Sequence, residues 1–216
     1  MSSPAPTVDT QSRSVAGGRL VWEIACNVVL SLLFLQFAAE QGRAVMTDFR
    51  ISTLLLLAKV STDVVFYLIR RLPKDTSFSP YDWFVGIAGT YAIVFFRPQA
   101  EGHDLLVGQA LQFGGLALQV LAMLSLNRSI GMVPANRGIQ TGGLYRWIRH
   151  PLYSSYVVAF LGYVISHPTA YNIGVYAAAV LLWVLRLLAE ERFLLQDPAY
   201  REFAEKVRWR LIPGVF

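Results

Sequence analysis

Residues that could do chemistry are densest between residues 127 and 153, where the sequence reads NRSIGMVPANRGIQTGGLYRWIRHPLY. Glycines in such a run permit tight turns and let the backbone approach a ligand closely. Pro151 can begin a helix, so Arg149 and His150 would lie at its N-terminus, where free backbone N–H groups favour an anionic ligand. A basic loop that only fixes membrane topology would have a similar composition, so both interpretations stay open.

Charged residues also gather at residues 186–192, at the end of an apolar stretch. Arg186 and Glu190 are four residues apart, so they share one face of a helix. An arginine embedded in lipid is costly unless it faces a polar interior, although snorkelling beside Glu190 would also satisfy it. A short connection over residues 167–172 predicts that this helix runs back beside the preceding one, which brings the charged end level with His150.

A site built from both clusters would offer a guanidinium, carboxylates, a histidine and tyrosine faces. Such a set suits a zwitterionic and partly aromatic ligand. S-adenosylmethionine is one such ligand, because its amino group needs a carboxylate, its carboxylate needs donors and its adenine needs an apolar slot. A nucleotide cofactor would suit the same residues, so the residue types alone leave this choice open.

The elements that must position these clusters are predicted to be membrane-spanning helices. Hydrophobic residues make up 55% of the 216-residue chain and charged residues only 15%, whereas about a quarter of a soluble domain is charged. A transmembrane helix needs about 20 mainly apolar residues. We therefore expect an all-α, polytopic bundle of about six spans, covering residues 21–39, 51–69, 81–96, 105–126, 152–165 and 173–189.

The distribution of charge predicts the orientation of the chain. With six spans and the N-terminus inside, most of the 19 Lys and Arg fall in cytoplasmic segments, and the outer loops hold only Arg43, Arg50 and Arg97. Cytoplasmic loops carry such an excess, so both termini and both clusters are expected on the cytoplasmic side of an integral membrane protein. Topology thereby explains the net charge of +5, and no nucleic acid partner is expected.

Three regions are expected along the chain: a flexible tail over residues 1–20, transmembrane helices over residues 21–126, and a core that carries both clusters over residues 127–216. The fourth predicted span contains closely spaced glycines, which let helix backbones approach one another; they are Gly108, Gly114 and Gly115. The single cysteine excludes an internal disulfide, and three histidines leave little material for a metal site, so none is predicted.

Three motifs stand out in the C-terminal part of the chain: RGIQTGGLYRWIRHPLY at residues 137–153, R-x-x-x-E-E at residues 186–191, and the segment 200–213. Together they resemble the isoprenylcysteine carboxyl methyltransferase family. Its members are integral-membrane enzymes that use S-adenosylmethionine, and phospholipid N-methyltransferases are relatives. The resemblance begins near Asn127, whereas the preceding spans resemble the family only in hydropathy.

The resemblance implies a methyltransferase with S-adenosylmethionine as its cofactor, and it assigns roles to residues. Glu190 would meet the amino group of the cofactor, with Glu191 as the other candidate. Arg186 would be the catalytic residue beside the methyl acceptor. The residues implied to bind the cofactor are Arg137, Gly138, Ile139, Gln140, Tyr145, Arg149, His150, Pro151, Leu152, Tyr153, Glu190 and Glu191.

The methyl acceptor stays open between a carboxylate, a thiol and an amine. Ser155 stands where the family often has glycine, and Arg137 and Gly138 stand where eukaryotic members commonly have a His-Thr pair. A carboxylate needs no general base, whereas a thiol or an amine must lose a proton, for which His150 or a glutamate is a candidate. We expect a lipophilic acceptor drawn from the bilayer, membrane lipids as partners, and no obligate protein partner.

Two other functions remain as alternatives. An NADPH-dependent membrane reductase of the sterol-reductase kind has a similar C-terminal end, and the basic loop could hold the 2′-phosphate of that cofactor. A non-enzymatic membrane scaffold could use Lys59 and Asp63. These two residues lie four apart in the second predicted span, on one helix face, where they could neutralise each other.

Overall fold

The computed structural model describes residues 10–69, 75–77, 79–98, 104–126, 133–136 and 138–216. Within these ranges the regular structure is helical apart from one short antiparallel ladder, in which Asp75 pairs with Asn136 and Thr76 with Ala135. The elements are α1 (Thr10–Thr47), α2 (Ile51–Ile69), β1 (Asp75–Thr76), α3 (Pro80–Tyr91), the 3₁₀ turn η1 (Ala92–Phe95), α4 (Leu106–Leu126), β2 (Ala135–Asn136), the 3₁₀ turn η2 (Gly143–Arg146), α5 (Pro151–Ser166), α6 (Ala170–Leu194) and α7 (Pro198–Lys206).

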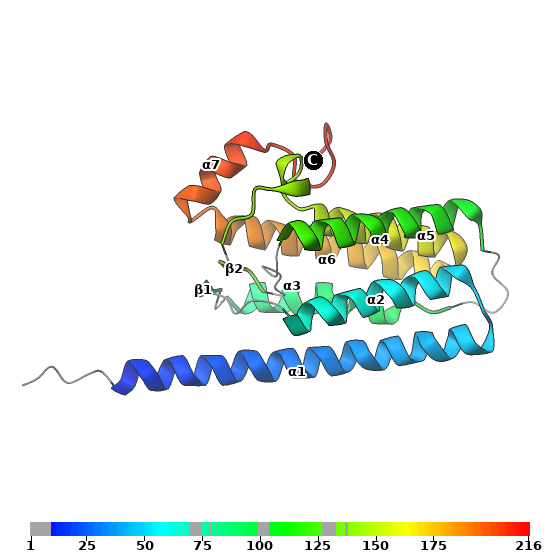
Figure 1. Cartoon of the computed structure of the whole chain (residues 1–216), viewed down its shortest axis with the longest axis horizontal. Coiled ribbons are helices and arrows are strands. Elements are labelled where there is room, and N and C mark those ends of the chain that lie inside the picture. Colours follow the sequence, from blue (N-terminus) through cyan, green and yellow to red (C-terminus); the bar gives the residue numbers. More distant parts are fainter. Residues whose placement is uncertain (1–9, 70–74, 78, 99–103, 127–132, 137) are drawn as a thin grey trace, which may run out of the picture.

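The long helices form a bundle. Figure 1 shows α1, α2, α4, α5 and α6 running along the long axis of the molecule, with α7 and the C-terminal segment on one outer side of it. The side chains of α7 pack against η2 through Tyr145, Tyr200 and Phe203. The all-α class expected from composition is therefore confirmed, and the bundle presents one end of α6 to the C-terminal segment.

The predicted spans correspond closely to helices. The stretches 51–69, 105–126 and 152–165 match α2, α4 and α5 within one residue at each end. Within the described ranges, α4 and α6 are long and apolar enough to cross a membrane, and α5 is a shorter apolar helix. The third stretch is not one regular helix, because α3 ends at Tyr91 and tightens into η1, a change that is frequent at helix ends.

The first helix is longer than the apolar stretch that it contains. It begins at Thr10, so residues 10–20 of the predicted tail are helical, while residues 1–9 lie outside the described ranges. The physical reason is that backbone hydrogen bonds hold a helix together whatever its side chains, so a helix can continue beyond its apolar part.

The helices α4 and α5 pack with their backbones in contact. A Cβ atom added at Gly115 would lie 2.6 Å from the backbone nitrogen of Ala159, and one added at Gly162 would lie 2.4 Å from the carbonyl oxygen of Gly108. The predicted role of small residues is thus confirmed at Gly108 and Gly115. Gly114 faces open space instead.

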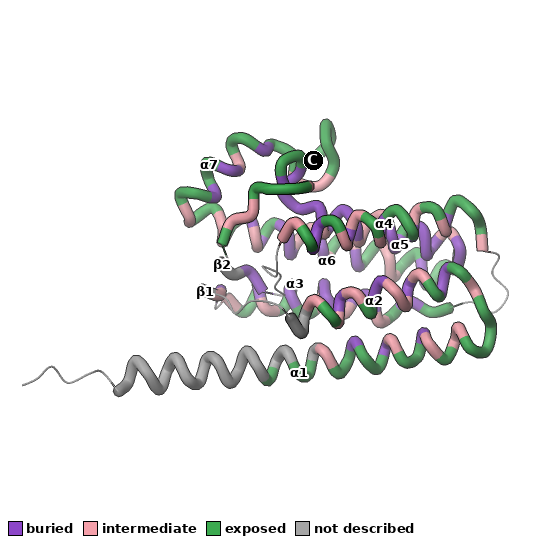
Figure 2. The backbone as a smooth tube through the Cα atoms, in the orientation of Figure 1, coloured by how far each residue is buried: buried purple, intermediate pink, exposed green. Residues whose placement is uncertain are grey.

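Burial separates an inner from an outer surface on the bundle (Figure 2). The core contains stacked aromatic side chains, with the rings of Phe96 and Phe160 4.8 Å apart and Trp183 packed on Phe160 at 5.6 Å. The outer side of α4 exposes large apolar residues, namely Leu106, Val107, Phe113, Leu121 and Leu124. Such an apolar surface is unfavourable in water and suits contact with lipid.

Candidate active site

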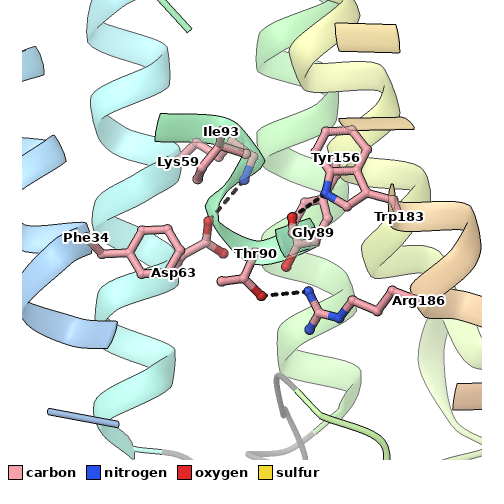
Figure 3. Close-up of a pocket in the computed structure, with 9 residues that line it drawn as sticks. All are labelled: Phe34, Lys59, Asp63, Gly89, Thr90, Ile93, Tyr156, Trp183 and Arg186. Carbon is pink, nitrogen blue, oxygen red and sulfur yellow. Dashed lines mark hydrogen bonds and ion pairs between the residues drawn. The ribbon is translucent and has the colours of Figure 1, made fainter. Parts of the chain in front are cut away.

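A small cavity lies inside the bundle (Figure 3). It is bordered by α1, α2, α3, η1, α5 and α6, and its walls combine charged side chains with aromatic ones. The lining residues are Phe34, Lys59, Asp63, Gly89, Thr90, Ile93, Tyr156, Trp183 and Arg186. Figure 3 shows the charged residues of α2 and the arginine of α6 approaching the space from opposite sides.

The α2 wall carries an ion pair. Lys59 Nζ donates to Asp63 Oδ2 at 3.0 Å, and both side chains are buried. The other carboxylate oxygen of Asp63 accepts from Gln119 Nε2 on α4, also at 3.0 Å. The pairing expected from the four-residue spacing is therefore confirmed, and it faces the cavity.

The α6 wall carries Arg186. Its Nη1 donates to Thr90 Oγ1 at 2.9 Å, and its guanidinium carbon lies 5.5 Å from the ring centre of Tyr153. Arg186 is 7% exposed, so it does not snorkel to the surface but faces a polar interior, as one of the two interpretations predicted.

Two contacts hold α3 against α6, and they place Thr90 beside the arginine. Trp183 Nε1 donates to the carbonyl oxygen of Gly89 at 2.8 Å. Near the other end of α3, Arg192 Nη2 pairs with Asp82 Oδ1 at 2.5 Å. The arginine side chain passes close to Gly89, where an added Cβ atom would lie in ordinary van der Waals contact, 3.5 Å from Arg186 Cδ.

Glu190 lies one helical turn beyond Arg186 and meets a different residue. Its Oε2 accepts from Tyr153 Oη at 2.9 Å, while the Tyr153 ring lies next to Tyr156 of the cavity wall, with centroids 6.1 Å apart. Tyr153 therefore connects the carboxylate predicted to meet the cofactor with the cavity that holds Arg186. The predicted convergence of the two clusters is confirmed at this tyrosine.

Glu191 is the centre of a second, tightly bonded group. Its Oε1 accepts from Tyr200 Oη at 2.6 Å and lies 2.8 Å from His150 Nε2. Its Oε2 lies 2.5 Å from Arg149 Nη1 and 3.2 Å from Arg210 Nε. Glu191 is 3% exposed, and burial together with its bond to this carboxylate raises the pKa of Tyr200. We call Glu191 and these four partners the Glu191 cluster.

The C-terminal segment covers the start of α5. The helix begins at Pro151, as predicted, but the backbone N–H groups of Arg149 and His150 donate to the carbonyl oxygens of Trp209 and Arg210, at 2.8 and 2.9 Å. Those two groups are therefore not free for an anionic ligand, which corrects the expectation from the sequence. The reason is that the chain's own C-terminal carbonyl groups satisfy them.

The segment before α5 is folded around a buried tyrosine. Gly138 and Gly143 have positive φ angles of 91° and 58°, which glycine adopts without strain. Tyr145 packs in the cluster with Tyr200, and its burial, followed by the charge of Glu190, raises its pKa. Among the other predicted residues, Ile139 packs against this cluster and Gln140 is partly buried.

The structure thus divides the predicted residues into three groups. Arg186 lines the cavity, and Tyr153 and Glu190 lie beside it. Arg149 and His150 are bonded to Glu191. Tyr145 and Ile139 pack in the cluster with Tyr200. Pro151 and Leu152 form the first turn of α5. Arg137 lies outside the described residues.

Sequence reasoning missed two parts of this arrangement. It did not place the Lys59–Asp63 pair in the same site as Arg186, although charges within an apolar helix are a signal of a functional interior. It also did not find Thr90, whose hydroxyl binds Arg186 from a helix distant in sequence. A lone threonine in an apolar stretch carries no signal that would have identified it.

Comparison with known proteins identifies the class to which this site belongs. Residues 103–200 match the family model described as phospholipid methyltransferase. The matched residues, a little under half of the chain, form a domain of the family of integral-membrane methyltransferases related to the isoprenylcysteine carboxyl methyltransferases. The chain is therefore a methyltransferase, of a family that generally uses S-adenosylmethionine.

This match agrees with the resemblance found in the motifs, and it favours neither the reductase nor the scaffold alternative. No curated protein matches the chain. The matched range contains Tyr153, Arg186 and Glu190, but it does not include α2, from which Lys59 and Asp63 reach the cavity.

Proposed function

We propose that the chain is a multi-pass membrane enzyme that moves the methyl group of S-adenosylmethionine to a lipophilic acceptor bearing a carboxylate, such as an isoprenylcysteine-like molecule. One observation carries the proposal. Helix α6 presents Arg186 to a cavity inside the bundle and, one turn later, Glu190 to Tyr153 at the edge of the predicted cofactor segment. An acceptor and a cofactor held at these two positions would be neighbours.

Six crossings with both termini and the site on the cytoplasmic side form part of this proposal. The six apolar stretches lie in helical segments, and the apolar outer surface of α4 supports lipid contact. The Glu191 cluster, the C-terminal segment and the start of α5 lie at one end of α6, where the basic residues gather. An excess of basic residues is typical of cytoplasmic segments.

The residues present fit S-adenosylmethionine. Glu190 offers a carboxylate to an ammonium group, and Tyr153 holds that carboxylate in place. Arg149 Nε is buried and has no hydrogen-bond partner among the described residues, so it could donate to a ligand carboxylate. When bound, S-adenosylmethionine supplies an electrophilic methyl group whose C–S electron pair returns to sulfur as the acceptor forms the new bond.

The chain's own residues then have a positioning task. Arg186 would hold one oxygen of the acceptor carboxylate while the other oxygen forms the bond to the methyl carbon, and the carboxylate becomes a neutral ester without loss of a proton. Orientation and exclusion of water would supply most of the rate. The engagement of His150 by Glu191 supports a carboxylate acceptor, because it occupies a candidate base that a thiol or an amine would need.

Transfer of labelled methyl from S-adenosylmethionine tests this proposal, with N-acetyl-S-farnesylcysteine, a total lipid extract and small thiols as parallel acceptors in detergent or vesicles. We expect transfer to the carboxylate. Arg186→Ala should reduce it by about 10²–10³-fold and leave binding of S-adenosylhomocysteine, measured by calorimetry, within about twofold. Loss of cofactor affinity in this variant would assign Arg186 to the cofactor and contradict its role at the acceptor.

A further inference from the structure

The cavity contains a charged group that the methyltransferase family match does not account for. Lys59 and Asp63 reach it from α2, which lies outside the matched residues 103–200. If the two charges of this ion pair served only to neutralise each other and to fix helix packing, the pair would not need to line a cavity. The pair faces the same space as Arg186 (Figure 3), so a role toward a ligand has to be considered.

The geometry of Lys59 leaves it capable of binding an anion. An ammonium group has three N–H donors, and Asp63 accepts one of them. The ammonium lies over the rings of Tyr156 and Phe160, at 4.4 and 4.9 Å from their centres. Aromatic faces stabilise a cation without bringing a second negative charge, so these rings hold the ammonium group at the cavity wall.

Asp63 differs from Lys59 in this respect. Both of its carboxylate oxygens have partners, Lys59 on one side and Gln119 on the other. It therefore holds the lysine in place and is a poor candidate to bind a further cation. The charged residues that line the cavity are Lys59, Asp63 and Arg186, so the lining has one positive charge more than it has negative ones.

We infer that Lys59 and Arg186 together bind one anionic oxyacid group of the methyl acceptor, so that the acceptor is an anionic amphiphile. This inference rests on the proposed function and specifies the class of its acceptor. The two cations approach from opposite sides of the cavity, and burial strengthens their attraction for an anion because little water is present to screen it. Phe34, Ile93 and Trp183 supply apolar wall for the adjoining chain.

Two kinds of acceptor contain this chemistry. In a prenylated cysteine derivative, the carboxylate itself would be bound and methylated. In phosphatidylethanolamine, the phosphate would be bound, and the neighbouring amine would be methylated after it has lost its proton to water. A neutral prenyl thiol or prenyl amide lacks the anionic group and should be a poor ligand. The cavity itself is small, so the rest of the lipid would extend between the helices.

The test measures steady-state methyl transfer by the full chain to N-acetyl-S-farnesylcysteine, phosphatidylethanolamine and farnesyl thiol. Lys59→Met alone would leave Asp63 buried without its cation, which is strongly destabilising. The informative variant is therefore the neutral pair Lys59→Met with Asp63→Asn, which keeps the hydrogen bond to Gln119. Lys59→Arg retains the charge, and Lys206→Met on exposed α7 is the matched control for removing a lysine.

We expect the neutral double variant to fold, to bind S-adenosylhomocysteine as the wild type does, and to raise KM for the anionic acceptor at least tenfold with kcat nearly unchanged. Lys59→Arg should recover most of the loss, and Lys206→Met should change nothing. A pair that serves packing alone would leave KM unaltered in the double variant once the protein folds. That result overturns the inference.

The acceptor series separates failure of the inference from failure of the proposed function. Transfer to phosphatidylethanolamine that depends on Lys59 supports the inference and contradicts only the carboxylate acceptor. If methyl transfer to farnesyl thiol equals or exceeds transfer to both anionic acceptors, the inference is overturned. The chain would then still be a methyltransferase that acts on lipophilic molecules. Cofactor binding without transfer to any of the three contradicts the proposed function, and the inference fails with it.

Discussion

Helix α6 contributes to two polar regions that lie little more than one turn apart and that are built differently. In the Glu191 cluster, each carboxylate oxygen has two partners, and these partners come from the residues just before α5, from α7 and from the C-terminal segment. In the cavity, Arg186, Lys59 and Asp63 surround space that protein atoms do not fill. A buried charge that is fully bonded fixes the chain around it, whereas charges around an open space can receive a ligand. The difference predicts that the first region controls stability and the second controls the reaction.

The strongest test of this comparison is Glu191→Ala. The change leaves Arg149 buried without its carboxylate and removes the acceptor shared by His150, Tyr200 and Arg210. Loss of one partner from a buried ion pair costs about 3–5 kcal/mol. We expect a large fall in the thermal unfolding temperature in detergent and rapid proteolysis of the segment after Val207.

Glu190→Ala is the control for this substitution. Glu190 is only partly buried, so its replacement should leave stability nearly unchanged. A stable Glu191→Ala protein that has lost cofactor affinity would reverse the comparison. It would make Glu191 the carboxylate that meets the cofactor.

A third polar group, at the opposite end of the bundle, tests whether bonded clusters act on stability alone. Ser52 Oγ lies 3.0 Å from His167 Nε2 and donates to Asp104. Burial lowers the pKa of His167 to about 4, although the charge of Asp104 opposes the shift and that of Arg50 adds to it. Burial alone would raise the pKa of Asp104. The hydrogen bonds from Ser52 outweigh this effect, so the net shift of the Asp104 pKa is downward.

Stability should therefore fall on acidification without a change in cofactor affinity. Between pH 6.5 and 4 the unfolded chain protonates His167 and the folded chain does not, so folding loses up to about 3 kcal/mol across this window. Asp104 extends the loss at lower pH. Urea unfolding as a function of pH measures this slope. His167→Gln, which keeps a polar group at Ser52, should flatten it between pH 6.5 and 4, and an unaltered slope would contradict the assignment to His167.

Glu190 belongs to the cavity side of the comparison, and its replacement should affect binding more than folding. Glu190→Gln removes the charge but keeps an oxygen that can accept from Tyr153. We expect about a tenfold loss of S-adenosylhomocysteine affinity, equivalent to about 1.4 kcal/mol, measured by calorimetry. Thermal unfolding should be unchanged. Unchanged affinity would show that the amino group of the cofactor does not bind at Glu190.

How much of this structure can be predicted from the sequence depends on whether the relevant sequence pattern is local. Apolar length and glycine spacing are local, so α2, α4, α5 and the close approach at Gly115 could be predicted. The i to i+4 spacing likewise predicts the Lys59–Asp63 pair. The order of helices around the bundle is not local, and for that reason the meeting of α2, α3 and α6 at one cavity could not be predicted.

The two adjacent glutamates illustrate the same limit within the site. Their positions in the motif are equivalent, and neighbouring helical residues point about 100° apart, so the sequence alone leaves their roles interchangeable. The structure separates them through distant partners, Tyr200 and Arg210 for Glu191 and Tyr153 for Glu190. These partners lie on α5, on α7 and in the C-terminal segment, whose positions depend on tertiary packing.

The smallest predicted effect concerns how Arg186 is aimed, and Thr90 supplies the test. Thr90→Val keeps the shape of the side chain but removes the oxygen that accepts from Arg186 Nη1. A single hydrogen bond of this kind is worth about 1 kcal/mol, so kcat should fall about fivefold while S-adenosylhomocysteine affinity stays the same. Thr90→Ser retains the hydroxyl and should recover the rate.

Gly89→Ala is the matched control for Thr90→Val, because it changes the neighbouring residue on the same wall. The added Cβ atom would lie 3.5 Å from Arg186 Cδ and 3.5 Å from the carbonyl oxygen of Leu182, which is ordinary van der Waals contact, so little change in rate is expected. If Thr90→Val behaves like the wild type while Gly89→Ala slows the reaction, the arginine is aimed by the shape of the wall and not by the hydroxyl. In that case the cavity would discriminate among acceptors mainly by fit, and the hydrogen bond to Thr90 would only stabilise the empty site.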